Sequence, residues 1–417
     1  MLKLGNCKAL YITYECFMII CIFSIMFFIW TNSSADTDYK FAPMDNKKLP
    51  DIYYAKGMID LRISDRHTRQ KIHYRRKRDL KFILVWSAMT SLPFSVMKQG
   101  RRDFERLRCP ITKCYVTSNV SFFNDVRDFD VIAFTGSNMD KEFLPENRAR
   151  FQKYIYFNMN SSASCPVNDA EFDGFFNGTA TYKLDSDLPL PHILVRDEYN
   201  VDIGPNIHIN WEKPKNYNPS FVQDIKFNDK KQAAVIYMSE CKSLSPRKYM
   251  LERLQKELIQ LGYAIDVWGP CGYFKCKTNM SECYEKWKKN YYYYLVYESV
   301  LDVDYVSDNL LIPLKNSLVP VVYGGADYTR FLPPESYLNA MKLSPKQLAK
   351  IMVNLIRKPE KYLQYFWWKS YYSFHDPKVN ENICNICSAV HNNHYWRRTE
   401  KMKKFRVWWN INYTALV

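Results

Sequence analysis

The sequence has few acidic residues for its number of basic ones, and it contains no nucleic-acid-binding motif. The 59 Lys and Arg outnumber the 43 Asp and Glu, which gives a formal net charge of +16. A basic excess suggests a polyanionic partner, but a nucleic-acid-binding protein should carry a recognisable motif as well. Part of the excess is also concentrated in residues 31–79. We therefore exclude nucleic acid as the partner, and the compartment signals that follow agree with this.

Charged residues are almost absent from residues 10–30, an apolar run of 21 residues interrupted only by Glu15. This is about the length that a membrane-spanning helix requires. Lysines precede the run and aspartates follow it, so the positive-inside rule puts a tail of residues 1–9 in the cytosol and the rest of the chain in the lumen. A cleaved signal peptide is the alternative, because Ser33 and Ala35 are small residues at plausible cleavage positions. The long uncharged core favours a transmembrane signal anchor.

Apolar periodicity is missing from residues 31–79, which we interpret as an extended or disordered stem. Within it, Arg75-Arg76-Lys77-Arg78 matches the pattern that late-secretory processing proteases cut. A solvated run of charge is the alternative, and it is the commoner use of such a segment.

Luminal placement predicts glycosylation and disulfide bonds. Acceptor sequons of the form Asn-X-Ser/Thr begin at Asn32, Asn119, Asn160, Asn177, Asn279 and Asn412. Of the twelve cysteines, three precede residue 31 and nine follow it. Because nine is an odd number, we expect at least one thiol to stay free or to pair between chains.

Beyond the stem, strand patterns alternate with helix patterns, which predicts an α/β fold with doubly wound sheets. Buried-strand patterns lie at 81–86, 130–134, 153–157, 233–238, 264–268, 293–297 and 319–323. A connection of low apolarity at 206–231 separates the first three from the rest. We predict one domain at 80–215, a second at 216–378 and a cysteine-containing tail at 379–417.

Two helices have clear start signals. Ser245 followed by Pro246 predicts an N-cap and a first helical residue, and Ser344 followed by Pro345 predicts another. Glycine 262 is expected to end the first of these helices.

The most informative motifs lie between residues 293 and 337. They are Glu298-Ser299, Asp304-Tyr305, Asp308-Asn309, Gly324-Gly325 and Phe331-Leu332-Pro333-Pro334-Glu335-Ser336. Together they resemble the donor-binding signature of the α-1,3-fucosyltransferases, glycosyltransferase family 10. The family has Asn at the position of Ser299, Glu at that of Asp308 and Lys at that of Asn309, so the chain is identified as a divergent member.

The resemblance implies a GT-B architecture, in which two Rossmann-like domains face a cleft, the first on the acceptor side and the second binding GDP-fucose. It implies transfer of fucose to N-acetylglucosamine with inversion, which needs positive charge for the departing diphosphate and a base for the acceptor hydroxyl. The family's arginine motif matches Arg247, although Leu244 stands where another arginine is often found. The implied donor-binding residues are Arg247, Glu298, Ser299, Tyr305, Asp308, Asn309, Gly324 and Gly325.

The position of the base is altered. The family has a glutamate shortly after an aromatic strand, and the matching segment ends here at Asn160. An amide does not accept the proton, and Asp169 or Glu171 replaces it only if the loop brings that carboxylate close. Loss of a positioned base typically costs about 10² to 10⁴ in rate. The sequence therefore predicts weak activity limited by Asn160.

Asp185-Ser186-Asp187 has a metal-binding alternative, because an Asp-X-Asp pair holds manganese in GT-A transferases. The resemblance puts the motif in the acceptor-side domain, where a structural role is expected. We expect no strictly required cofactor, with Mn²⁺ at most a stimulant.

Cys384 and Cys387, with His391 and His394 close behind, make up half of a zinc site. In an oxidising lumen a disulfide role is the stronger expectation. The resemblance implies structural roles for Cys109, Cys114, Cys384 and Cys387.

These observations predict a single-pass type II Golgi membrane protein with its catalytic part in the lumen, which transfers fucose from GDP-fucose to N-acetylglucosamine of glycoprotein glycans. The alternative is a catalytically impaired family member that binds a luminal glycan or nucleotide sugar. The basic charge suits both, since basic luminal domains bind nucleotide sugars or acidic glycans.

Overall fold

The structure, a computed structural model, describes residues 79–86, 89–136, 139, 143–213, 227–276, 279–392 and 402–410. The predicted cytosolic tail, the anchor at 10–30 and nearly all of the stem lie outside these ranges, as does the basic motif at 75–78. Within the ranges, every helix is too short or too polar to cross a membrane.

Six parallel strands form the first sheet, in the order β2-β1-β3-β4-β5-β6. The predictions at 81–86, 130–134 and 153–157 are confirmed, because continuous apolar runs suit strands that are buried on both faces. The other three strands are short or polar enough that no apolar run marked them. The strands are β1 Lys81–Val85, β2 Cys114–Thr117, β3 Val131–Thr135, β4 Lys153–Asn158, β5 Gly178–Thr181 and β6 Leu188–Pro189.

A second parallel sheet has the order β10-β9-β11-β12-β13, and all four predicted strands of this half are confirmed. Tyr293 of β11 pairs with Val319 of β12, so the two central strands with the segment between them form the expected crossover unit. The strands are β9 Gln232–Tyr237, β10 Ile265–Trp268, β11 Tyr291–Tyr297, β12 Val319–Tyr323 and β13 Leu338–Asn339.

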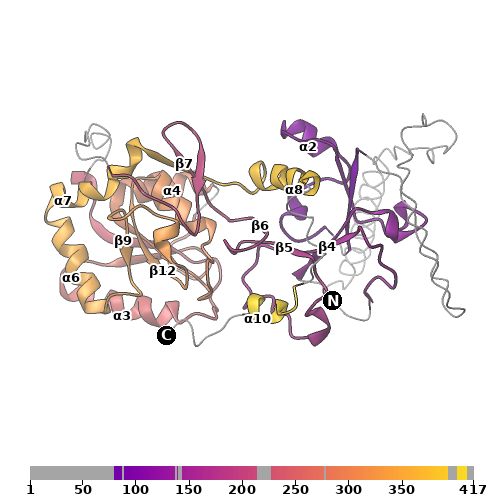
Figure 1. Cartoon of the computed structure of the whole chain (residues 1–417). Coiled ribbons are helices and arrows are strands. Elements are labelled where there is room, and N and C mark those ends of the chain that lie inside the picture. Colours follow the sequence, from indigo (N-terminus) through magenta and orange to yellow (C-terminus); the bar gives the residue numbers. More distant parts are fainter. Residues whose placement is uncertain are drawn as a thin grey trace, which may run out of the picture. The chain divides into compact units, whose positions relative to one another are not determined.

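Helices accompany both sheets. Figure 1 shows α3, α6 and α7 beside β9 and β12, and Leu251, Leu258 and Met352 from α3 and α6 share one core with strand residues such as Val321. The helices are α2 Arg102–Arg106, α3 Arg247–Gln260, α4 Met280–Asn290, α5 Leu311–Lys315, α6 Pro345–Ile356, α7 Pro359–Leu363, α8 Glu381–His391 and α10 Phe405–Trp409.

The two predicted helix starts have different outcomes. Ser344 caps α6 through a capping box with Gln347, as its sequence predicts. The N-cap prediction for Ser245 is wrong, because Pro246 occupies the N-cap of α3 without a side-chain bond. The hydroxyl of Ser245 donates instead to the backbone carbonyl of Glu298 at 2.6 Å. The hydroxyl that the local pattern assigned to the start of α3 is therefore bonded to a residue distant in the sequence.

A small antiparallel sheet has the order β14-β7-β8. It joins β7 Leu194–Asp197 and β8 Asp202–Gly204 to β14 Tyr372–His375. Strands from the predicted domain at 80–215 thus share a sheet with a strand from the predicted domain at 216–378.

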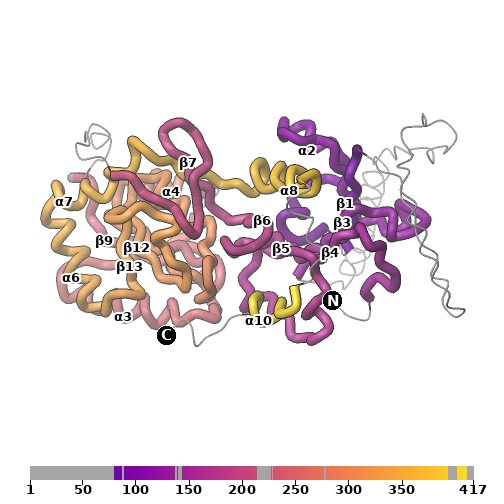
Figure 2. Tube along the Cα trace, viewed as in Figure 1, coloured from indigo at the N-terminus to yellow at the C-terminus, as the bar shows by residue number. Residues whose placement is uncertain are grey.

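The segment at 379–417 contains α8 and α10, which pack into the cores of the first sheet. Ile383 and Ile386 of α8 lie in the core on one side of that sheet, and Phe405 and Trp409 of α10 lie in the other. Figure 2 shows α8 next to α2 and the indigo chain, and α10 below β5 in the same half of the fold. The last part of the chain therefore completes the half with which the described fold begins.

Candidate active site

Glu298 directly follows β11, and its side chain is buried at the carboxyl end of that strand. Its Oε1 accepts hydrogen bonds from the backbone N–H of Ser307 at 2.9 Å and from the Ser307 hydroxyl at 3.0 Å. Burial raises the pKa of Glu298 to about 7, because desolvation of the charged form outweighs these bonds. Glu298 therefore fixes the loop just before Asp308 and Asn309.

Arg247 is the first residue of α3, and its guanidinium is buried beside the end of β11. It donates to the backbone carbonyls of Tyr297 at 3.2 Å and Glu240 at 2.8 Å. Its Nε is buried without a hydrogen-bond partner in the described part of the chain. Desolvation lowers the pKa of Arg247, although a guanidinium stays charged near neutral pH. A buried cation with an unpaired donor is a group that an anionic ligand would satisfy.

Ser245 joins this arginine to the loop at residues 298–307, which we call the donor loop. Its hydroxyl donates to the carbonyl of Glu298, and its backbone N–H donates to the carbonyl of Ser299 at 2.9 Å. These bonds bring together Arg247, Glu298 and Ser299, which separate sequence motifs indicated.

Gly324 and Gly325 follow β12 and lie against the same loop. A β-carbon at Gly324 would clash with the hydroxyl of Tyr328 and come within 3.0 Å of the Glu298 side chain. At Gly325 it would lie 2.6 Å from the backbone nitrogen of Asp302. Only glycine permits this close approach. The pair is thus required for packing beside Glu298, and its role in phosphate binding stays a prediction.

Asp302 also fixes this loop, and no sequence pattern indicated its role. Its Oδ2 accepts hydrogen bonds from the Ser162 N–H at 2.8 Å, the Ser162 hydroxyl at 2.7 Å and the Tyr182 hydroxyl at 2.6 Å. Asp304, two residues on, accepts from the backbone N–H of Leu184 and from Arg330. The loop is therefore bonded to segments that follow β4 and β5 of the first sheet.

Tyr305 packs edge-on against two rings from the same side. Its ring centroid lies 5.1 Å from that of Tyr182 and 5.8 Å from that of His192. The Nε2 atom of His192 lies 2.8 Å from the carbonyl oxygen of Met159. Burial raises the pKa of Tyr305, so its hydroxyl is neutral at physiological pH.

Asp308 is paired with a lysine that sequence reasoning did not identify. Lys378, which follows β14, places its Nζ 2.5 Å from Oδ2 of Asp308. Desolvation opposes ionisation of Asp308, but the bond and charge of Lys378 outweigh it and lower the pKa of this carboxyl. A cation thus lies beside Asp308, one residue before the neutral Asn309, the position at which the family has a lysine. Its position 69 residues farther along the chain explains why no local pattern revealed it.

Asn160 lies just beyond the end of β4 and is exposed. Its backbone N–H donates to Oδ1 of Asn158 at 2.9 Å, and its side-chain amide lies 3.9 Å from the Cys165 sulfur. Ser162, the third residue of the Asn160 sequon, is buried and bonded to Asp302. Asn160 is therefore at the carboxyl edge of the first sheet, two residues from a contact with the donor loop.

The carboxylates of the Asp185 and Asp187 motif are bonded within the protein. Asp187 accepts from the backbone N–H of Thr179 at 2.9 Å and from its hydroxyl, and Asp185 accepts from the Trp408 indole at 2.9 Å. These bonds favour the structural role over manganese binding.

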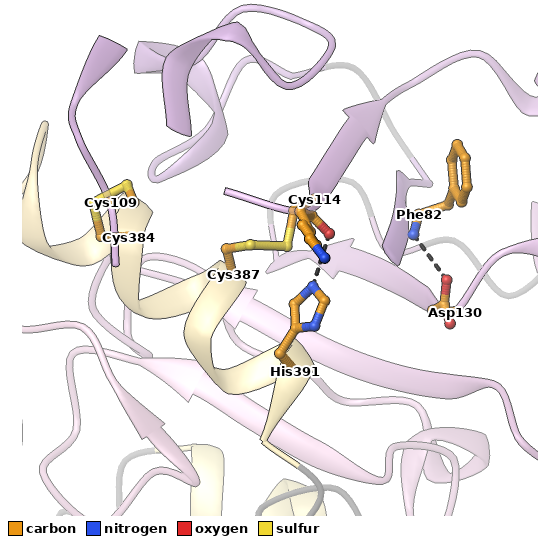
Figure 3. Close-up of a disulfide and its surroundings, with 8 residues drawn as sticks. Phe82, Cys109, Cys114, Asp130, Cys384, Cys387 and His391 are labelled. Carbon is orange, nitrogen blue, oxygen red and sulfur yellow. Dashed lines mark hydrogen bonds between the residues drawn. A yellow bond between two sulfur atoms is a disulfide. The ribbon is translucent and has the colours of Figure 1, made fainter. Parts of the chain in front are cut away.

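Disulfide bonds attach α8 to the first sheet, and Figure 3 shows the face of α8 that carries them. His391, on the same face, contacts the carbonyl oxygen of Lys113 at 2.7 Å. A sulfur in a disulfide is not a thiolate, so the zinc alternative is wrong for this oxidised form. His394 lies outside the described residues.

Cys165 is the one free cysteine among the described residues, in agreement with the odd count. The bonds are Cys109–Cys384, Cys114–Cys387, Cys241–Cys271 and Cys276–Cys283.

The predicted glycosylation sites differ in their surroundings. Asn119 and Asn279 are exposed, and each side chain accepts from the backbone two residues on. Asn177 is half-buried, and its Oδ1 accepts from the backbone N–H of Tyr154 at 3.0 Å. Asn32 and Asn412 lie outside the described residues.

Comparison with known proteins agrees with this arrangement. A model described as "Fucosyltransferase, N-terminal" matches residues 78–193, and one described as "Glycosyltransferase family 10 (fucosyltransferase) C-term" matches residues 227–408. Alpha-(1,3)-fucosyltransferase C of Drosophila melanogaster is 30% identical, over 73% of this chain and 71% of that protein. Glycoprotein 3-alpha-L-fucosyltransferase A of the same organism is 26% identical, over 79% of this chain and 60% of its own length.

A crystal structure of an α1,3-fucosyltransferase with GDP-fucose is 12% identical to this chain, covers 75% of it and 91% of that chain, and gives a TM-score of 0.46. The family models and the sequence relatives make this chain a glycosyltransferase. It belongs to glycosyltransferase family 10, the fucosyltransferase family, as its motifs indicated.

Proposed function

We propose that this chain is an α-1,3-fucosyltransferase that transfers fucose from GDP-fucose to N-acetylglucosamine of glycoprotein glycans with inversion, at a low rate. The observation that carries the proposal is the cluster at the carboxyl end of β11, where Arg247, Glu298 and Ser299 meet. In parallel α/β sheets this edge is where ligands bind. The names of two relatives, an alpha-(1,3)-fucosyltransferase and a glycoprotein 3-alpha-L-fucosyltransferase, support the fucosyl transfer in this proposal.

The charges of this cluster suit a nucleoside diphosphate. When fucose leaves GDP, negative charge develops on the departing diphosphate, and fixed positive groups stabilise it. Arg247 supplies one cation with an unpaired Nε, and Lys378 supplies another beside Asp308. Tyr305, Asn309, Gly324 and Gly325 complete the proposed donor site.

The acceptor is proposed to bind on the side of the first sheet, in a GT-B arrangement with two Rossmann-like domains. Support comes from the bonds of Asp302 to Ser162 and Tyr182, which tie the donor loop to the ends of β4 and β5. Asn160 lies in the same region. Its amide does not accept the proton of the acceptor hydroxyl, which is the reason for the low rate of fucose transfer in this proposal.

The second candidate is a luminal protein that binds a nucleotide sugar or a glycan without useful catalysis. The exposed amide at Asn160 and the neutral Asn309 favour it. As a nucleotide-sugar-binding protein it would bind GDP in the same way, and in either form it would transfer no fucose, so a transfer assay separates the two candidates.

The proposed location is the Golgi membrane, with a single-pass type II anchor at 10–30 and the folded part in the lumen. It rests on the apolar run, the lysines before it and the sequons after it. Four disulfides among the described residues fit an oxidising compartment.

The deciding experiment uses the full-length chain, purified in detergent. Transfer from GDP-fucose to a panel of N-acetylglucosamine-containing acceptors is measured with and without Mn²⁺, and GDP affinity is measured by calorimetry. Transfer that is slow but dependent on the acceptor supports the proposal, and GDP binding without transfer supports the second candidate. A chain that does not bind GDP rejects the transferase and the nucleotide-sugar form of the second candidate.

A further inference from the structure

His192 lies between β6 and β7, and one of its ring nitrogens has a defined partner. Its Nε2 is 2.8 Å from the carbonyl oxygen of Met159, the residue before Asn160. A carbonyl oxygen accepts hydrogen bonds and donates none, so Nε2 must carry a proton. In the neutral imidazole the second nitrogen, Nδ1, then holds a lone pair that accepts a proton. The backbone beyond β4 thus fixes both the orientation and the tautomer of this ring.

The neighbours of His192 include residues of the proposed donor site. The ring packs edge-on against Tyr305, with centroids 5.8 Å apart. Lys378, Asp308 and Asp376 are the charged groups that act on it. Desolvation and then the charge of Lys378 lower the pKa of His192, and together they outweigh the two aspartates. The ring is therefore neutral at pH 7.

Three other groups in this region either lack a basic atom or already accept hydrogen bonds. The side chain of Asn160 is an amide, and Oδ2 of the buried Asp302 already accepts three hydrogen bonds. Asp185 accepts the indole N–H of Trp408. His192 differs from these groups, because its bond to Met159 uses the nitrogen that donates and leaves the basic nitrogen.

We propose that His192 is the general base of the transfer reaction, an inference that rests on the proposed function. The acceptor hydroxyl oxygen forms a bond to C1 of fucose while the bond from C1 to the β-phosphate oxygen breaks, and GDP leaves with that electron pair. The hydroxyl proton passes to Nδ1 of His192, and the imidazolium that forms then releases it to water. The base thus comes from the segment after β6 and is oriented by the residue that precedes Asn160.

The test is the variant His192→Gln in the full-length chain. Glutamine keeps an amide N–H that can donate to the Met159 carbonyl, but it has no basic nitrogen. We expect kcat to fall by about 10²- to 10⁴-fold with unchanged GDP affinity. The decline of wild-type kcat/KM at acidic pH, below the ordinary imidazole pKa of about 6.5 because the pKa of His192 is lowered, should disappear from the residual activity. His375→Gln is the matched control, because His375 is also half-buried and hydrogen-bonded, to Ser373 at 2.9 Å.

A second variant guards against a merely structural effect. Asn160→Glu, placed in the His192→Gln background, should restore turnover at least tenfold by supplying a carboxylate close to the same position. Wild-type kcat and pH profile in His192→Gln would overturn the base role alone. Parallel loss of kcat, GDP affinity and melting temperature would show a structural histidine and also overturn it. A wild-type chain that binds GDP but transfers no fucose overturns the proposed function and the base role together.

Discussion

The side-chain ammonium of Lys378 lies 2.5 Å from a carboxylate oxygen of Asp308, although 70 positions separate the two residues. The side chain of Lys378 is largely buried, with 17% of it exposed, whereas that of Asp308 is 51% exposed. Buried charges act more strongly on a ligand than exposed ones, because less water screens them. The pair therefore places a cation in the loop region where the proposed donor site needs one.

Replacing this lysine should weaken GDP binding. For Lys378→Met we expect a loss of about 1.5 to 3 kcal/mol, the range for a hydrogen bond to a charged group. Calorimetry with GDP measures it, and guanosine, which has no phosphate, should bind both forms equally. Lys361→Met, an exposed lysine on α7, is the control. The double variant Asp308→Asn/Lys378→Met should also bind GDP weakly. Full recovery of GDP affinity in this variant would mean that Lys378 only neutralises Asp308.

Arg247 should make a contribution of similar size. Arg247→Ala removes a buried guanidinium whose Nε has no hydrogen-bond partner among the described residues, and we expect GDP binding to weaken by about 1.5 to 3 kcal/mol. The change also removes two bonds to backbone carbonyls, so melting temperature must be recorded alongside. Arg253→Ala on the exposed face of α3 provides the comparison. Equal GDP affinity in a folded Arg247→Ala protein would remove this arginine from the site.

Adding a second cation at position 309 should have the opposite effect. Asn309→Lys is expected to tighten GDP binding and to raise the transfer rate, since positive charge stabilises the developing charge of the leaving diphosphate. Titration calorimetry and initial rates measure the two effects, with Asn309→Gln as a neutral control of similar length. Weaker GDP binding in Asn309→Lys would show that residue 309 does not face the diphosphate.

Asn160 is the position at which a new carboxylate should help most. Asn160→Glu is expected to raise turnover about tenfold or more, given what a positioned base contributes. Asn160→Gln removes the sequon without adding a base and separates the two effects. Mass spectrometry of the wild-type chain reports whether a glycan occupies Asn160. If turnover does not rise although the wild-type site is unmodified, the acceptor does not bind near the end of β4.

Glu298 makes the free energy of unfolding depend on pH, and its raised pKa determines the sign of that dependence. Its pKa rises from an ordinary 4.5 to about 7 in the folded state, so between these values the folded chain binds more protons than the unfolded chain. The contribution of Glu298 to the free energy of unfolding is therefore greatest below pH 4.5 and is lost as pH rises toward 7. At about 1.4 kcal/mol per unit, the loss is of order 3 kcal/mol.

Denaturant unfolding between pH 5 and 8 measures this effect. The variant Glu298→Gln keeps a neutral side chain and should lose less stability than the wild type over that interval. Parallel stability curves for the two proteins would mean that Glu298 is ionised at neutral pH and that the Ser307 bonds outweigh its burial.

The sequence by itself determined the central strands, one helix start and the family. Tyr291–Tyr297 and Val319–Tyr323 are continuous apolar or aromatic runs, and such runs form strands buried on both faces of a parallel sheet. Ser344 and Gln347 cap α6 because both partners of the capping box lie within one turn. The spacing of Glu298, Asp304 and Asp308 indicated the family, because these residues also lie within one short segment of the chain. Each of these features depends on residues close together in the chain.

Only the tertiary structure decided how the site is assembled. Ser245 follows no local rule, because its hydroxyl donates to the Glu298 carbonyl and does not accept from the N–H groups at the start of α3. Asp302 bonds to Ser162 across 140 positions, and Lys378 reaches Asp308 across 70. The choice among such distant partners depends on which polar groups become buried together, since a buried group without a partner is costly. That condition exists only after the sheets have formed, and for this reason no pattern in the sequence revealed Lys378 or the orientation of His192.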